Sequence, residues 1–353
     1  LPFAGVAFAI VLISCWQIDW GGAPVALPPP PRSRAEGTRW AFATDGRIIE
    51  YSVLGSSRPD ARVLVSGHIA QLAGIVKPAA WTAALEALNV KDISVSLPCL
   101  GSSECLPGRK LHDWPLTDLE PVLEAERVGP FFVWGASLGS LQAVAVAQRY
   151  GPERVLALGL RTPYLPLPLS RAESLPDGPS SSFMTSSEIT SGSFAVWCLR
   201  TLMLATKGFL YADSPLLHHA SMLSTYPEEM RYLLAMAHRA LYDGHYGALA
   251  SLYVTARDVT IDAPGVDVRA VRLGGDRVVV WYGEDDAFVP PSHGAWLAQH
   301  FGAQVRMLNG YGHAGATVID MAQFLEVLIG PAPETYYEDM YGGPVDLDDA
   351  IIR

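Results

Sequence analysis

Short apolar runs that end in small or polar residues recur along the chain and predict the strands of a buried sheet. These runs are residues 62–67, 92–98, 131–136, 277–282 and 304–308. A further buried strand is expected to end at Thr162. Residues 39–51 carry the turn pair Asp45-Gly46 at their centre, and this pattern predicts a hairpin at the start of the sheet.

A helical pattern follows the run 131–136. Residues 138–150 are rich in Ala, Val, Leu and Gln, which favour helix. Strands that alternate with helices are typical of an α/β domain with a mostly parallel sheet. We expect this domain to comprise residues 38–162 and 268–330.

An insertion separates the two halves of the expected domain. Residues 163–193 are rich in Pro and Ser and predict a loop. Apolar residues then recur at three- and four-residue spacing in 194–209, 227–241 and 248–259. Residues 163–267 are therefore predicted to form a helical cap, which would exclude water and line an apolar pocket.

The N-terminal segment is apolar and free of charge from residue 1 to Trp16, and Trp20 follows. As a helix, about 20 residues would span roughly 30 Å, the thickness of a bilayer core. A cleaved signal peptide and an apolar segment packed on the domain are the alternatives. We expect a retained membrane anchor at residues 1–20, followed by a stiff Pro-rich linker at 21–37.

The C-terminal segment, residues 331–353, is acidic, contains three tyrosines and has no helical period. In isolation such a tail is expected to be disordered. Other subunits of a membrane assembly are the candidate partners for both terminal segments. The pattern does not distinguish the mitochondrial inner membrane from another organelle or the cell membrane.

Composition narrows the range of partners. The chain has 353 residues and a formal net charge of −11, with no basic stripe, which argues against binding to nucleic acid. Its four cysteines match neither a disulfide framework nor a zinc motif. A local bridge between Cys99 and Cys105 is conceivable, but two buried or free thiols are the favoured interpretation. The histidines of the predicted cap match no metal-ligand spacing, so no metal is expected.

The turn after residues 131–136 carries the first candidate for chemistry. Gly135, Ser137 and Gly139 form the pattern G-x-S-x-G between a predicted strand and a predicted helix. A serine on such a sharp turn has a strained backbone and an exposed hydroxyl, and its neighbours must be small. The N–H groups at the start of the helix favour a developing oxyanion. Ser137 is therefore the predicted nucleophile.

An acid and a base follow in loops after later strands. Asp286 comes after the strand 277–282, and His313 lies in the glycine-rich loop after the strand 304–308. Parallel sheets bring such loops together at one edge. In nucleophilic catalysis an imidazole takes the hydroxyl proton and a carboxylate orients the imidazole. The predicted catalytic residues are Ser137, His313 and Asp286.

With these motifs the chain resembles the α/β-hydrolase superfamily, specifically its cap-bearing serine hydrolases, over about residues 38–330. The resemblance implies that Asp286 is the acid and that Asp285 is a solvated neighbour. It also implies an oxyanion hole formed by the backbone N–H groups of Leu138 and His68. No metal and no organic cofactor is implied.

Two loops depart from the superfamily pattern. The superfamily usually has His-Gly after its third strand, whereas this chain has Ser66-Gly67 and a histidine displaced to His68. In the loop after the next strand, Ser96 and Cys99 replace an acid and a glycine. These changes leave the three predicted catalytic residues in place and affect the surroundings of the oxyanion.

Two functions from different classes fit this pattern. The first is a membrane-anchored, single-pass serine hydrolase that cleaves a small apolar acyl substrate, such as an ester. The second is an accessory subunit of a membrane protein assembly that keeps the fold with little or no catalysis. Covalent labelling of Ser137 by a fluorophosphonate distinguishes the first from the second.

Overall fold

The computed structural model describes residues 38–67, 79–98, 100–106, 108–177 and 263–330. The predicted anchor, linker and acidic tail lie outside the described residues, as do His68 and the three apolar runs of the predicted cap. Within the described part of the chain, no helix has both the length and the apolar character needed to cross a membrane.

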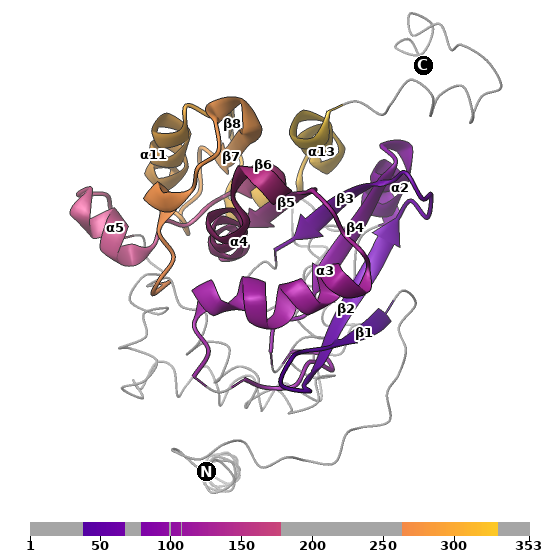
Figure 1. Cartoon of the computed structure of the whole chain (residues 1–353). Helices are drawn as coiled ribbons and strands as arrows, with labels where there is room; N and C mark the ends of the chain where they lie inside the picture. Colours follow the sequence, from indigo (N-terminus) through magenta and orange to yellow (C-terminus); the bar gives the residue numbers. More distant parts are fainter. Residues whose placement is uncertain (1–37, 68–78, 99, 107, 178–262, 331–353) are drawn as a thin grey trace, which may run out of the picture.

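The described strands form one eight-stranded sheet in the order β1-β2-β4-β3-β5-β6-β7-β8 (Figure 1). β2 runs antiparallel to β1 and β4, and the other neighbouring pairs are parallel. The predicted mostly parallel sheet is thus confirmed. The strands are β1 (Thr38–Phe42), β2 (Ile48–Gly55), β3 (Arg62–Ser66), β4 (Val90–Val95), β5 (Phe131–Ala136), β6 (Val155–Arg161), β7 (Val278–Gly283) and β8 (Gln304–Leu308).

The first two strands form the predicted hairpin. Gly46 has a φ of +86°, a conformation that suits glycine because it has no Cβ. The N–H of Gly46 donates to the carbonyl of Ala43, and the N–H of Ala43 donates to that of Arg47, both at 2.9 Å. Asp45-Gly46 therefore makes the turn, as the sequence predicts.

Helices cover both faces of the sheet (Figure 1). The larger buried cluster contains side chains of α3, α4 and α11, and the smaller one, on the opposite face, contains side chains of α2, α12 and α13. The α-helices are α2 (Ala79–Ala87), α3 (Glu120–Ala125), α4 (Gly139–Arg154), α5 (Leu167–Ala172), α11 (Pro291–Phe301), α12 (His313–Val318) and α13 (Met321–Ile329). Short 3₁₀ or π turns occupy Leu111–Asp113, Pro115–Leu119, Val268–Ala270 and Gly275–Arg277.

The helix after β5 is α4, and it is buried from Gly139 to Ala147 between the sheet and the turns at Leu111–Asp113 and Pro115–Leu119. Its regular part ends near the predicted position, because Gly151 has a φ of +62° and Pro152 follows. α4 begins at Gly139, two residues after Ser137, so the fold places a helix N-terminus close to Ser137.

Two expectations need correction. The predicted loop 163–193 contains a helix, α5, in its described part, and Leu167 and Ser170 of this helix are buried. The interpretation of Cys105 as a free thiol is wrong, since Cys105 is disulfide-bonded. The other three cysteines of the chain lie outside the described residues.

Candidate active site

Ser137 lies on the sharp turn between β5 and α4. Its φ is +54°, a conformation that costs a non-glycine residue about 1–3 kcal/mol. Three hydrogen bonds hold this backbone: the N–H of Ser137 donates to the carbonyl of Arg161 at 3.0 Å, and the N–H and Oγ of Ser140 donate to the carbonyl of Ser137 at 3.0 and 2.6 Å. The strained conformation is therefore fixed by its surroundings.

The small residues of the motif are required by close backbone contacts. A Cβ at Gly135 would lie 2.0 Å from the carbonyl oxygen of Gly139, and a Cβ at Gly67 would lie 2.7 Å from the same atom. Both distances are below any real Cβ contact. These glycines let the ends of β3 and β5 approach the start of α4, on either side of the turn that carries Ser137.

His313 is the first residue of α12 and follows β8. Its Nε2 atom lies 3.0 Å from Ser137 Oγ, and its Nδ1 atom lies 2.7 Å from Asp286 Oδ2. The structure thus brings together the three residues that the sequence predicts for catalysis. They come from the loops after β5, β7 and β8, which all leave the same edge of the sheet.

Asp286 is held in the loop after β7 and is 5% exposed. Its Oδ1 atom accepts the backbone N–H groups of Phe288 and Val289 at 2.9 and 2.8 Å, which leaves Oδ2 to face the imidazole. The neighbouring side chain of Asp285 is exposed. Asp286, and not Asp285, is therefore the carboxylate beside His313.

These contacts define the tautomer of His313. An ionised carboxylate can only accept hydrogen bonds, so Nδ1 carries the proton and donates it in a hydrogen bond to Asp286 Oδ2. The lone pair of Nε2 then faces the hydroxyl of Ser137 across 3.0 Å. This arrangement can accept the serine proton, because donor and acceptor are within hydrogen-bonding reach.

A second Ser–His contact in the structure lacks this property. Ser170 Oγ lies 3.2 Å from Nε2 of His293, but that nitrogen also faces the carbonyl of Pro176 at 3.0 Å. The N–H of Leu165 points to Nδ1 of His293 at 3.4 Å. Since a carbonyl only accepts, the proton is on Nε2, and burial lowers the pKa of His293. No lone pair of His293 is therefore available to Ser170.

The predicted oxyanion donors are only partly described. Leu138 follows Ser137, precedes the first residue of α4 and is buried. His68 lies outside the described residues, one position beyond Gly67, whose N–H donates to the carbonyl of Trp134 at 2.7 Å. The structure therefore describes this loop as far as Gly67.

Ser66, one of the departures from the superfamily pattern, belongs to a buried polar network. Its hydroxyl donates to Asp92 Oδ1 at 2.5 Å and accepts the indole N–H of Trp134 at 2.7 Å. The other oxygen of Asp92 accepts the indole N–H of Trp81 at 3.1 Å. This network connects the end of β3 to β4, β5 and α2, and no local sequence pattern predicts it.

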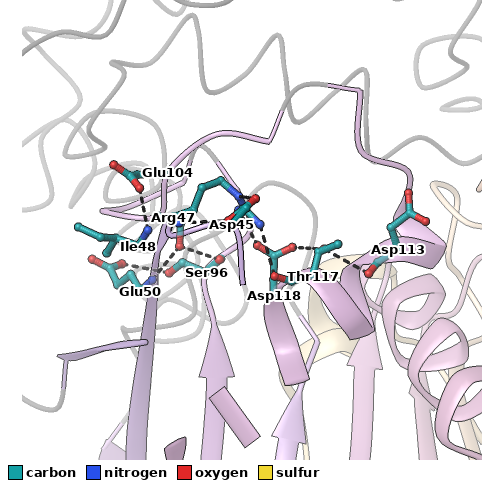
Figure 2. A network of polar contacts seen from close by, with 10 residues as sticks. Asp45, Arg47, Ile48, Glu50, Ser96, Glu104, Asp113, Thr117 and Asp118 are labelled. Carbon is teal, nitrogen blue, oxygen red and sulfur yellow. Dashed lines mark hydrogen bonds and ion pairs between the residues drawn. The ribbon is translucent and has the colours of Figure 1, made fainter. Parts of the chain in front are cut away.

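The second departure, Ser96, is compensated by an acid from another strand. Glu50 on β2 is fully buried, and its carboxylate accepts Ser96 Oγ and the N–H of Ser102, both at 3.0 Å (Figure 2). The N–H of Ile48 also donates to Glu104 at 2.7 Å. The loop after β4 is thus held by β2, although it lacks the acid that the superfamily usually has there.

One further side chain lies at the site. Phe288 is 45% exposed, and its ring centroid lies 5.0 Å from that of the His313 imidazole. It therefore offers an apolar surface beside the reactive atoms. In the described part of the chain, no three His, Cys, Asp or Glu side chains are grouped so that they could hold a metal ion.

Solved structures with the same fold have low sequence identity to this chain. The esterase RhEst1 from Rhodococcus sp. ECU1013 is 20% identical, with a TM-score of 0.57 over 82% of this chain and 97% of the other. Cfl2 from Burkholderia cenocepacia is 19% identical, with a TM-score of 0.56 over 85% and 98%. The enol-lactonase from Burkholderia xenovorans LB400 is 17% identical, with a TM-score of 0.52 over 82% and 98%.

The family assignment comes from the sequence itself. No curated protein matches the chain. The family model described as the alpha/beta hydrolase fold matches residues 100–316, which is more than half of the chain and includes Ser137, Asp286 and His313. With its sheet order and the position of Ser137 after β5, the chain belongs to the α/β-hydrolase fold family.

Proposed function

We propose that this protein is a serine hydrolase that cleaves carboxylic esters or related acyl compounds. The observation that carries the proposal is the pair of contacts made by His313, 3.0 Å from Ser137 Oγ and 2.7 Å from Asp286 Oδ2. The strained turn at Ser137 and the N-terminus of α4 beside it support the same reading.

The proposed reaction has two stages. Ser137 Oγ attacks the acyl carbon while Nε2 of His313 takes the hydroxyl proton, and the same nitrogen then protonates the leaving alcohol. Water next attacks the acyl-enzyme, with His313 again as the base. Asp286 keeps the proton on Nδ1 and stabilises the imidazolium in both stages. The reaction uses only these side chains, backbone N–H groups and water.

The oxyanion that forms on the acyl group requires donors. The N–H of Leu138, directly after the nucleophile, and that of His68 are the proposed pair. Donors of this kind act in a water-poor site and are each worth about 10²–10³-fold in rate. Leu138 lies at the start of α4, so the positive end of the helix dipole adds to its effect.

A small apolar acyl group is the proposed substrate feature. Phe288 presents its ring beside the imidazole, where an acyl chain would pass. The solved structures with this fold include proteins described as esterases and an enol-lactonase. Esters are therefore the first compounds to assay.

The direct test is labelling by a fluorophosphonate, which forms a covalent bond with an activated serine. We expect the full chain to be labelled at Ser137 and to hydrolyse p-nitrophenyl butyrate, and Ser137→Ala to lose both. Ser170→Ala is the matched control, because it removes a hydroxyl that also contacts a histidine. An unlabelled wild-type protein would instead favour the accessory-subunit function.

We also propose that residues 1–20 anchor the enzyme to a membrane. The support is the charge-free apolar run up to Trp16. The expected result is that the full chain stays in the membrane fraction after alkaline carbonate extraction, whereas a chain that begins at residue 38 is released. Release of both forms contradicts the proposal.

A further inference from the structure

Arg161, at the end of β6, is a fully buried cation. Its Nε and Nη2 atoms donate to the carbonyl of Ala316 at 3.2 and 2.7 Å, and Nη2 also donates to the carbonyl of Ile319 at 2.5 Å. Among the described residues, no carboxylate forms an ion pair with it. Burial lowers the pKa of Arg161 to about 9, so the guanidinium is still protonated at neutral pH.

Aromatic rings surround this charge. The guanidinium carbon lies 5.4 Å from the ring centroid of Trp281 and 5.1 Å from that of Phe324, and Nη1 contacts the sulfur of Met321. Cation–π contacts partly replace the lost hydration. A buried charge is nevertheless costly, and an apolar side chain would fit such surroundings better for stability alone.

The carbonyls that Arg161 binds belong to the end of α12. This helix has six residues, from His313 to Val318, and Ile319 follows it as the C-cap. Carbonyls at the end of a helix have no partner within the helix, and a cation there also interacts favourably with the helix dipole. A helix this short is unstable on its own, so its position depends on such contacts. Arg161 thus holds the opposite end of the helix that carries the catalytic imidazole.

Thr162 makes a second connection between β6 and His313. Thr317 Oγ1 donates to the carbonyl of His313 at 2.8 Å, so Thr162 Oγ1 must be the donor in its 3.0 Å contact with Thr317 Oγ1. The main chain completes the link, since the carbonyl of Arg161 accepts the N–H of Ser137 at 3.0 Å. The end of β6 therefore contacts both the nucleophile's backbone and the helix of the base.

We propose that Arg161 is a positioning residue that fixes α12 and thereby holds Nε2 of His313 in line with Ser137 Oγ. The proposal rests on the hydrolase function proposed above. Arg161 touches neither the substrate nor the reacting atoms, and its effect passes through the carbonyls of Ala316 and Ile319.

The test is Arg161→Met, which keeps an unbranched side chain about as far as the position of Nε and removes all the donors of the guanidinium. We expect kcat to fall about 10- to 100-fold, because a displacement near 1 Å costs this much, with KM within about threefold of the wild-type value. The NMR signal of the proton between His313 Nδ1 and Asp286 should shift or broaden. Arg161→Lys keeps the charge and should recover part of kcat.

Arg62→Met is the matched control. Arg62 also donates to backbone carbonyls, those of Leu88, Ile329 and Gly330. It lies at the start of β3, however, at the opposite end of the parallel strands from Ser137. It should lower stability without changing kcat or the His313 proton signal. Equal effects of the two substitutions on kcat, or wild-type kcat and proton signal in folded Arg161→Met, would overturn the proposal.

Two further measurements make the test decisive. If Arg161→Met does not fold, kcat and the His313 proton signal are measured in Arg161→Lys and Thr317→Val instead. Wild-type values of both in these two variants would refute the role of the end of β6. The proton signal needs no substrate, so it reports on positioning even if no ester is cleaved. Absence of labelling at Ser137 in the wild-type protein would count against the hydrolase function alone.

Discussion

His313 Nε2 lies 3.0 Å from Ser137 Oγ, although 176 residues separate the two along the chain. They meet because β5 and β8 are parallel members of one sheet, and the loops that leave their carboxyl ends lie at the same edge. Their loops are not neighbours in the sheet, since β6 and β7 lie between them. The imidazole reaches the serine from α12, so catalysis should depend on both ends of this helix and on Asp286.

The carboxylate of Asp286 should control the tautomer of His313. Asp286→Asn can keep an oxygen toward the N–H groups of Phe288 and Val289, which turns its NH₂ group toward Nδ1. The imidazole would then carry its proton on Nε2 and could not accept one from Ser137. We expect kcat to fall about 10⁴-fold with a small change in KM, measured with a p-nitrophenyl ester.

Asp285→Asn is the control for this experiment. It changes the adjacent, exposed carboxylate by the same chemical step. We expect wild-type kcat and KM. A loss of activity in Asp285→Asn as large as that in Asp286→Asn would mean that the charge of the loop, and not the contact with His313, is what matters.

The close approach of β5 and α4 gives a second prediction. In Gly135→Ala, the new Cβ would lie 2.0 Å from the carbonyl oxygen of Gly139, so the start of α4 must move. We expect the free energy of unfolding to fall by about 1–3 kcal/mol, as for overpacked cores, and kcat to fall about 10- to 100-fold. Urea unfolding and ester hydrolysis measure the two effects.

Gly129→Ala tests whether the effect comes from the close contact. No atom lies within 4 Å of a Cβ placed at Gly129, so stability and activity should stay at wild-type values. If Gly135→Ala also behaved like the wild type, the turn at Ser137 would be more tolerant than its geometry implies.

Much of this fold could be predicted because several of its strands are short apolar runs. The run 131–136 corresponds to β5, the run 277–282 contains most of β7, and Asp45-Gly46 makes the predicted turn. Ser137, Asp286 and His313 could be found because each follows such a run. The choice of Asp286 over Asp285 came from resemblance, and the structure explains it by the two N–H groups that bind Oδ1.

The residues that hold the site could not be predicted in the same way. Glu50 and Asp92 are charged residues within strands, and in the sequence they look like solvent-facing positions. Both are buried, because the strand order brings them to Ser96 and Ser66, which are far away along the chain. The role of the Arg161 guanidinium likewise depends on the position of α12, whose last carbonyls it binds. Such contacts depend on the sheet order, which no local pattern encodes.

The buried carboxylate of Glu50 gives a third prediction. In Glu50→Gln, an NH₂ group replaces one of the two oxygens that accept Ser96 Oγ and the N–H of Ser102. The NH₂ group can donate to Ser96 Oγ, but the hydroxyl proton of Ser96 then loses its acceptor on residue 50 inside the protein. We expect the free energy of unfolding to fall by about 1–3 kcal/mol in urea unfolding. Glu124→Gln, at an exposed position on α3, should leave it unchanged.

The buried imidazole of His293 should make stability depend on pH. Burial lowers its pKa from the usual 6.5, and the carbonyl of Pro176 and the charges of Asp177 and Asp286 offset this only in part. As the pH falls below about 6.5, the unfolded chain binds a proton at His293 that the folded chain does not bind. The free energy of unfolding should therefore be highest above this pH and decrease as the pH falls toward 5.

His293→Gln separates this contribution from those of other groups. The side-chain NH₂ of glutamine can still donate to the carbonyl of Pro176, but it does not titrate. We expect urea unfolding midpoints measured between pH 7.5 and 5 to decrease less steeply in this variant than in the wild type. His300→Gln, at an exposed position of α11, should keep the wild-type dependence. A buried neutral imidazole at position 293 predicts that the plots of unfolding midpoint against pH for the wild type and His293→Gln converge as the pH falls. Parallel plots would show that the proton is taken up by another group.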